Sequence, residues 1–175
     1  MKSTGGRRKY WLWILGALAL AFALWNLLWY LLYFYPIKQC FHEDYRQTSW
    51  NTGFAVREVQ GDNWFTCAVK APDYLSTEGN LSLVSRDGSY DMLIWPNYLS
   101  GKAVYAVGVG EAVTVTEGQP IPKNVKHYTF YIDAAGKPVE SNYEQIAAEY
   151  RPQIMELLDM AWSEWGVGLP PEARG

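Results

Sequence analysis

Residues 10–35 read YWLWILGALALAFALWNLLWYLLYFY and carry no charged side chain. Asn26 is the one strongly polar residue among them. As an α-helix this stretch would be about 39 Å long at about 1.5 Å per residue, and the hydrocarbon core of a bilayer is about 30 Å thick. Trp and Tyr gather near both ends of the stretch, as they do where a helix meets the two membrane surfaces. The sequence therefore predicts a transmembrane anchor over residues 10–35, with the lipid bilayer as its partner.

The residues before the anchor are basic. Four of the 15 Lys and Arg residues and none of the 18 Asp and Glu residues lie there, namely Lys2, Arg7, Arg8 and Lys9. The chain after them therefore has a formal charge of −7. The positive-inside rule makes residues 1–9 a cytoplasmic tail and places the C-terminal domain outside the cytoplasm, in a periplasm, at a cell surface or in a lumen. An acidic domain repels phosphates, so we expect no nucleic-acid partner.

The apolar stretch leaves two further questions open. Its basic start and its alternating alanines also fit a cleaved signal peptide, but the apolar region of such a peptide usually spans about 7–15 residues, which favours a retained anchor. Ala17 and Ala21 form a small-xxx-small pair that permits a second helix to approach, and Asn26 could hydrogen-bond across that interface. These three residues are the candidate intramembrane contact. The alternative is that the alanines are ordinary filler and that Asn26 lies near the outer headgroups.

Cys40 and Cys67 are the two cysteines of the chain. An even number of cysteines in an oxidising compartment predicts one disulfide. It would join the juxtamembrane connector, residues 36–51, to a strand of the domain. Closing this loop of about 28 residues would contribute roughly 3 kcal/mol in the chain-entropy model. The alternative is a pair of buried thiols.

Residues 52–166 are expected to form one α+β domain. Runs rich in β-branched and aromatic residues alternate with turn residues, and Asp87-Gly88 is a pair that tolerates the positive φ of a tight hairpin. The pattern predicts an antiparallel sheet of about six strands. The expected strands lie within 52–59, 64–70, 81–96 as a hairpin, 103–117 and 125–133.

The pattern changes to that of a helix after residue 140. Apolar residues recur at steps of three and four from Tyr143 to Trp165, which predicts a helix with one apolar face. Ser141 and Glu144 match a capping box. Pro152 removes a backbone donor, so we expect a kink or two abutting helices near Tyr150. The helix should end at Gly166 and Gly168, cover one face of the sheet, and be followed by a tail over residues 167–175.

Few residues suggest catalysis. His42, Glu43 and Asp44 are the tightest cluster of metal-ligand residue types, but three adjacent side chains rarely converge on one ion. His127 is expected on the strand face opposite Phe130, and no nucleophile motif accompanies it. The chain has no P-loop and no dinucleotide-binding fingerprint. We therefore expect no metal and no cofactor.

The loop WPNYLSG, residues 95–101, is the leading candidate for binding. Trp95, Tyr98 and Leu99 are of the kind enriched at interface hot spots, and Trp50 is a further candidate. The alternative for Trp95 is that it closes the end of the core. The sequence predicts a non-enzymatic, membrane-anchored extracytoplasmic module that binds a protein partner or serves as an accessory subunit. The alternatives are a small envelope hydrolase and a binder of glycans or other small ligands through exposed aromatic residues.

Overall fold

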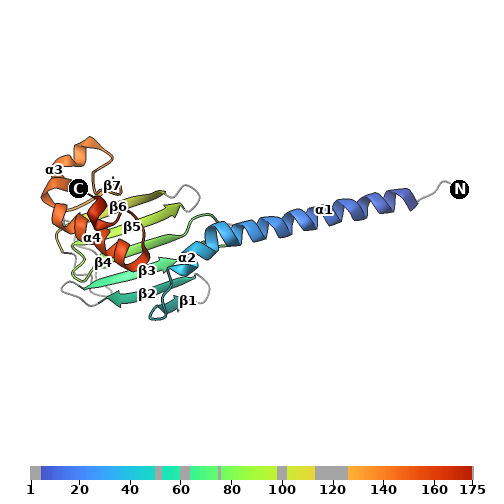
Figure 1. Ribbon diagram of the computed structural model, residues 1–175, viewed down its shortest axis with the longest axis horizontal. Coiled ribbons are helices and arrows are strands. Elements are labelled where there is room, and N and C mark those ends of the chain that lie inside the picture. The colour runs from blue at the N-terminus through green and yellow to red at the C-terminus, as the bar shows by residue number, and fades with distance from the viewer. Residues whose placement is uncertain are drawn as a thin grey trace.

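The computed structural model describes residues 5–49, 53–59, 64–74, 76–97, 102–112 and 126–174. Within these ranges the chain forms an N-terminal helix, an antiparallel sheet and a C-terminal pair of helices (Figure 1). The α+β class predicted from the sequence is therefore confirmed.

The N-terminal helix projects away from the rest of the molecule (Figure 1). It consists of α1 (Gly5–Trp29), a π-helical turn (Tyr30–Phe34) and α2 (Tyr35–Gln39), which follow one another without a break. Residues Tyr10–Gln39 are long and apolar enough to cross a membrane, and their most apolar window has no buried residue. A helix that exposes so much apolar surface is unfavourable in water, because the transfer of apolar surface from water to an apolar environment lowers the free energy.

The sheet is a meander in which every strand pairs with its neighbours in the sequence, in the order β1-β2-β3-β4-β5-β6-β7. All six pairings are antiparallel. The strands are β1 (Arg46–Ser49), β2 (Phe54–Val59), β3 (Phe65–Lys70), β4 (Asn80–Ser85), β5 (Tyr90–Asn97), β6 (Lys102–Gly110) and β7 (His127–Ile132).

Two expectations about the strands are corrected. The described sheet has seven strands, because β1 forms within the segment expected to be a connector. Its sequence RQTS has no apolar alternation to reveal it, and it pairs on one side only, as an edge strand. The expected strand 103–117 is β6, which ends at Gly110, and residues 113–117 lie outside the described ranges.

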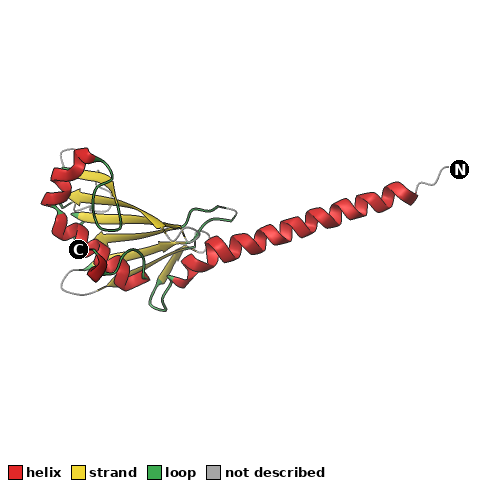
Figure 2. Cartoon of the chain, turned by 45° about the horizontal axis from the view of Figure 1, so that its top comes forward, coloured by secondary structure: helices red, strands yellow, loops and turns green. Residues whose placement is uncertain are grey.

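The strand register gives the sheet two distinct faces, because successive side chains of a strand point to opposite sides. We call the face that packs on the helices the inner face and the other the outer face. Figure 2 shows the helices of the domain lying along one side of the twisted sheet. One inner row crosses five strands through paired positions, which are Cys67, Leu83, Met92, Val107 and Phe130.

The C-terminal helices supply the other half of the core. A 3-10 turn (Ser141–Tyr143) leads into α3 (Glu144–Glu149) and α4 (Arg151–Trp165), and a last 3-10 turn spans Pro171–Ala173. The expected break at Tyr150 is confirmed. The buried residues of α4 belong to the same core cluster as the inner face of the sheet, and are Ile154, Leu157, Leu158 and Ala161.

The two ends of the helical region differ in how well the sequence predicted them. The capping box is wrong, because Ser141 begins the 3-10 turn and no side chain caps the start of α3. The predicted stop is confirmed, since Gly166 has a φ of 64° and its N–H bonds the carbonyl of Trp162. Glycine adopts this left-handed conformation without the penalty that a Cβ brings.

Candidate functional site

The N-terminal helix is joined to the domain by specific contacts near its C-terminal end. The indole N–H of Trp29 donates to the carbonyl oxygen of Ser76 at 2.6 Å, and its ring lies 5.5 Å from that of Tyr74. The Tyr74 hydroxyl donates to Oδ1 of Asn26 at 2.6 Å. Ile37 is 2% exposed and belongs to the core cluster of the domain. The helix and the domain are therefore packed together at this junction.

The residues predicted to contact another helix divide into two groups. The side-chain NH2 group of Asn26 donates to the carbonyl of Phe22 at 2.7 Å, and its Oδ1 accepts from Tyr74. The donor and the acceptor of this side chain therefore both have partners within the chain. Ala17 and Ala21 are exposed on α1. An intramembrane contact through these alanines stays a prediction.

The expected Cys40–Cys67 disulfide is not formed in the structure, where both cysteines are buried thiols. The thiol of Cys40 donates to the carbonyl of Pro36, one turn earlier, at 3.7 Å. Cys67 lies in β3, where burial, followed by the nearby Glu164 carboxylate, raises the pKa of its thiol to about 12 despite the opposing effect of Arg57. A link between the two cysteines in an oxidising compartment stays a prediction.

A group of polar residues that is remote in sequence meets where β2, the segment after α2 and the end of α4 come together. We call it the Glu164 cluster. The Glu164 carboxylate accepts hydrogen bonds from the Tyr45 hydroxyl at 2.9 Å and from Arg57 at 3.1 Å, while its side chain is 9% exposed. His42 Nε2 donates to the backbone oxygen of Glu164 at 2.7 Å. The indole of Trp165 donates to the Tyr45 hydroxyl at 2.9 Å.

The hydrogen bonds of the Glu164 cluster connect two distant parts of the chain. Burial raises the pKa of the Tyr45 hydroxyl, and the adjacent Glu164 carboxylate raises it further, because ionised Tyr45 would place two negative charges together. Tyr45 is therefore a neutral hydrogen-bond donor at physiological pH. The cluster ties the chain after the N-terminal helix to the last turn of α4, and sequence spacing gave no signal for it.

The described helices of the domain lie on one side of the sheet (Figure 2), and the outer face carries exposed apolar side chains. Val104 is 52% exposed, Tyr131 48% and Val84 39%. Partly buried apolar residues of the same face complete a patch that we call the outer patch, and they are Phe54, Val56, Leu93, Trp95 and Ala106. A sheet face that is turned to water usually carries polar residues at these positions.

The polar residues His127 and Asp91 form a pair beside the outer patch. Nε2 of His127 lies 3.3 Å from Oδ1 of Asp91, across the intervening strand β6. Gly108 occupies the position beneath this pair, and a Cβ there would collide with both side chains. His127 lies on the sheet face opposite to that of Phe130, as the sequence predicted. Among the described residues, no serine, threonine or cysteine side chain is hydrogen-bonded to His127.

The predicted binding loop is only partly within the described ranges. Trp95 belongs to strand β5 instead of a loop, and it is half-buried on the outer face. It lines a cavity of about 270 Å³ together with Tyr33 and Ile37 of the N-terminal helix. Tyr98 and Leu99 lie outside the described residues, as does Trp50.

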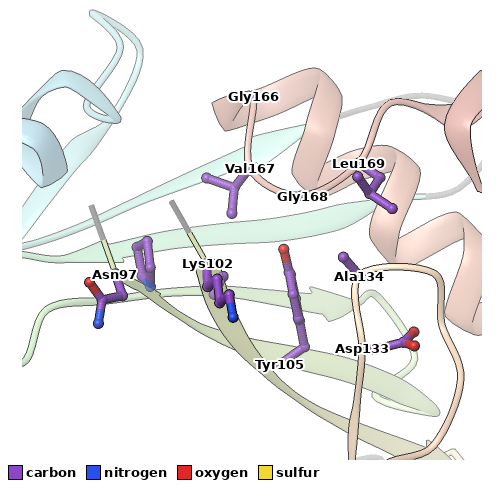
Figure 3. Close-up of a pocket in the computed structure, with 11 residues that line it drawn as sticks. Asn97, Lys102, Tyr105, Asp133, Ala134, Gly166, Val167, Gly168 and Leu169 are labelled. Atoms are coloured by element: carbon purple, nitrogen blue, oxygen red, sulfur yellow. The ribbon is translucent and has the colours of Figure 1, made fainter. Parts of the chain in front are cut away.

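A larger cavity lies on the inner side, at the end of β5 and β6. It measures about 500 Å³ and is bounded by the segment Gly166–Leu169 that follows α4. Figure 3 shows the Tyr105 side chain rising from β6 toward this segment. The sequence offered no signal for this cavity beyond the two glycines that end α4.

Within the described ranges, no group of three or more His, Cys, Asp or Glu residues is arranged to hold a metal ion. His42 instead bonds the backbone of Glu164, and Asp44 lies 3.6 Å from Arg57. No protein-family model, curated protein or solved structure matches the chain.

Proposed function

We propose that the chain is a single-pass membrane protein whose outer patch binds a protein partner outside the cytoplasm. The observation that carries this proposal is the outer patch itself. Solvent-exposed apolar residues that cluster on one face of a sheet are typical of surfaces that bind another protein. The helices bury the inner face, whereas the outer face remains accessible to a partner.

The anchor and its junction support the same proposal. The N-terminal helix has the length and apolarity of a membrane span, and the basic residues before it favour a cytoplasmic N-terminus. Trp29, Tyr74 and Ile37 hold the domain against the outer end of this helix. A domain held in this way presents the outer patch at a fixed height above the bilayer, which lowers the entropic cost of meeting a partner in the same membrane.

The partner is expected to be a protein with an apolar centre and a polar rim. The outer patch mixes Val104, Leu93 and Tyr131 with the polar pair Asp91 and His127 at its edge. Such a mixture resembles interfaces in which a few apolar anchors carry most of the binding energy. A hydrolase or a glycan binder remains the alternative, and no described serine, threonine or cysteine side chain is hydrogen-bonded to His127.

Chemical cross-linking in intact cells tests the proposal with two matched variants. Val104→Lys puts a charge in the outer patch, whereas Val139→Lys puts the same charge at an exposed valine outside the strands. We expect Val104→Lys to reduce the cross-linked partner at least about tenfold, because a buried unpaired charge is costly, and Val139→Lys to leave it unchanged. Equal capture by both variants would remove the outer patch from the interface.

Thiol labelling tests the orientation separately. A cysteine at the exposed position of Val139, outside the outer patch, should react with a membrane-impermeant reagent in intact cells, whereas a cysteine at Ser3 should not. Cys40 and Cys67 are buried in the domain and should contribute little background. The opposite labelling pattern would reverse the proposed topology.

A further inference from the structure

The cavity beneath the segment after α4 has the features of a ligand site. We call Gly166–Leu169 the strap and the space beneath it the strap cavity. Its volume of about 500 Å³ falls within the range of roughly 300–1,000 Å³ that is usual for small-molecule sites. Most of its wall is apolar, and is formed by Pro96, Ala103, the ring of Tyr105, Ala134, Val167 and Leu169.

The Tyr105 hydroxyl points into this space (Figure 3). Tyr105 is 2% exposed, and its hydroxyl makes no hydrogen bond to any described residue. Figure 3 shows the hydroxyl directed toward the strap, beneath Gly168. A Cβ on Gly168 would lie 3.1 Å from this hydroxyl, so glycine at this position keeps the space open. A hydroxyl that lines a cavity without a protein partner can hydrogen-bond to water or to a ligand that displaces the water.

The strap is held in place independently of any ligand. Arg174 is 4% exposed, and its guanidinium donates to the carbonyl of Leu169 at 2.7 Å, to the carbonyl of Leu158 at 2.9 Å and to the Asp159 carboxylate. These bonds fix the strap to α4 at its far end. The strap cavity is therefore preformed, which reduces the ordering cost of binding.

The strap cavity lies next to the cavity that Trp95 shares with the N-terminal helix. Pro96 and Asn97 line both cavities. Tyr33 and Ile37 of the N-terminal helix also line the second cavity. Both residues follow Trp29, whose indole bonds the domain. The strap cavity therefore lies close to the end of the N-terminal helix that packs on the domain.

We propose that the strap cavity binds the acyl chain of a lipid, with the carbonyl oxygen of the chain accepting a hydrogen bond from the Tyr105 hydroxyl. The proposal rests on the membrane anchoring proposed above, and not on the outer patch. An acyl chain matches the apolar part of the wall, and its ester or carboxyl oxygen can accept a hydrogen bond from the Tyr105 hydroxyl. Lys102 and Asp133 also line the cavity and bring one charge of each sign, which suits a zwitterionic headgroup or a fatty-acid carboxylate near Lys102.

Photocross-linking of the full chain in phosphatidylcholine nanodiscs tests this site. One arm contains a trace of palmitic acid with a diazirine on its chain, and the other contains a phosphatidylcholine with the same labelled chain. We expect adducts on the lipid-facing residues of α1 in both arms, which report insertion, and additional adducts on Ala103–Val107 or on the strap. The arm that gives these additional adducts identifies the source of the chain as free fatty acid or phospholipid.

Three variants separate the strap cavity from general lipid contact. Ala103→Leu fills the cavity and should remove its adducts at least about tenfold while leaving those on α1. Tyr105→Phe keeps the shape of the site and should reduce its adducts by about two- to tenfold, the usual value of one hydrogen bond. Val104→Leu changes the adjacent, outward-facing residue and should have no effect.

Two outcomes would overturn the proposal. Adducts confined to α1 would show that the chain is inserted but that the strap cavity takes no lipid. Cavity adducts that persist unchanged in both Ala103→Leu and Tyr105→Phe would show that the label enters elsewhere. If α1 itself gave no adducts, the membrane anchoring would fail first, and the loss would be assigned to the proposed function. Thermal melts of each variant in nanodiscs establish that the domain remains folded.

Discussion

The two faces of the sheet use the same strands in different ways. On β6, Tyr105, Val107 and Val109 point inward and are at most 2% exposed, whereas Val104 points outward and is 52% exposed. The inner face packs on α4, and the outer face has no described helix on it (Figure 2). Apolar residues on both sides of a strand are normal when both sides are buried. The outer face of the isolated chain therefore keeps apolar surface that the partner proposed above would cover.

This difference predicts how substitutions divide. Changes on the inner side should lower stability, because they remove transfer energy and leave cavities in a packed core. Changes on the outer side should leave stability almost unchanged and affect binding instead. The predictions below run from the largest expected loss of stability to the smallest.

The first prediction concerns the centre of the inner side. Leu157 is fully buried in α4, and Leu157→Ala should lower the free energy of unfolding by about 2–5 kcal/mol. Denaturant unfolding measures this loss. Thiol labelling offers a second measurement, because Cys67 is buried with a pKa of about 12 and should react only when the domain opens. The prediction would be wrong if Leu157→Ala unfolded at the same denaturant concentration as the unchanged chain.

The second prediction concerns the polar edge of the inner side. Glu164→Ala removes the acceptor for both Tyr45 and Arg57, which should cost about 2–3 kcal/mol because these groups are left unpaired in a partly buried site. Glu149→Ala, at an exposed position of α3, is the matched control and should change stability by less than about 0.5 kcal/mol. Equal melting temperatures for the two variants would contradict the expected contribution of the Glu164 cluster to stability.

The sequence predicted those parts of the fold that depend on local pattern. The hairpin at Asp87-Gly88, the break near Tyr150 and the end of α4 at Gly166 each follow from the backbone preferences of one or two residues. Strand β1 was missed because RQTS carries no apolar alternation. The capping box at Ser141 failed because the chain begins this region with a 3-10 turn, and a short motif does not distinguish the two.

The sites were less predictable because they depend on residues that are far apart in the sequence. Tyr45 and Glu164 are separated by 119 positions, and no spacing rule brings them together. Asn26 was a candidate for contact with a second helix, and its hydrogen bond to Tyr74, which is 48 positions away, could not be read from the sequence. Trp95 was identified as a surface aromatic, but its place beside the N-terminal helix follows only from the fold.

The third prediction concerns the turn that joins β4 to β5. Oδ1 of Asp87 accepts hydrogen bonds from the Ser85 hydroxyl at 2.9 Å, from the Ser89 N–H at 3.0 Å and from the Ser89 hydroxyl at 2.7 Å. The bond from the Ser89 N–H contributes most to holding the pKa of this carboxyl below its usual value. Asp87→Ala should therefore cost about 1 kcal/mol at neutral pH, a value limited by the exposure of the carboxylate to solvent.

The pH dependence of this loss has a definite sign. Because the folded pKa is lowered, the ionised carboxylate stabilises the fold fully above the unfolded value of about 3.9. The stabilisation disappears as the pH falls through the lower folded pKa. The difference in stability between Asp87→Ala and the unchanged chain should thus narrow below about pH 4. Urea melts at pH 7 and at acidic pH measure it, and a difference that widened in acid would refute the assignment.

The last prediction returns to the outer face, where the effect on stability should be smallest. Val104 pairs with Trp95 across β5 and β6, and its side chain is half-exposed. In Val104→Lys the aliphatic stem of the lysine can cover the same neighbours while its charge stays in water. The free energy of unfolding should therefore change by less than about 0.5 kcal/mol, as measured by denaturant unfolding of the purified chain. A loss of more than about 2 kcal/mol would mean that the native protein already covers this face, because only a buried position makes an introduced charge that costly. A small loss of stability together with a large loss of cross-linked partner would instead assign the inner face to folding and the outer face to binding.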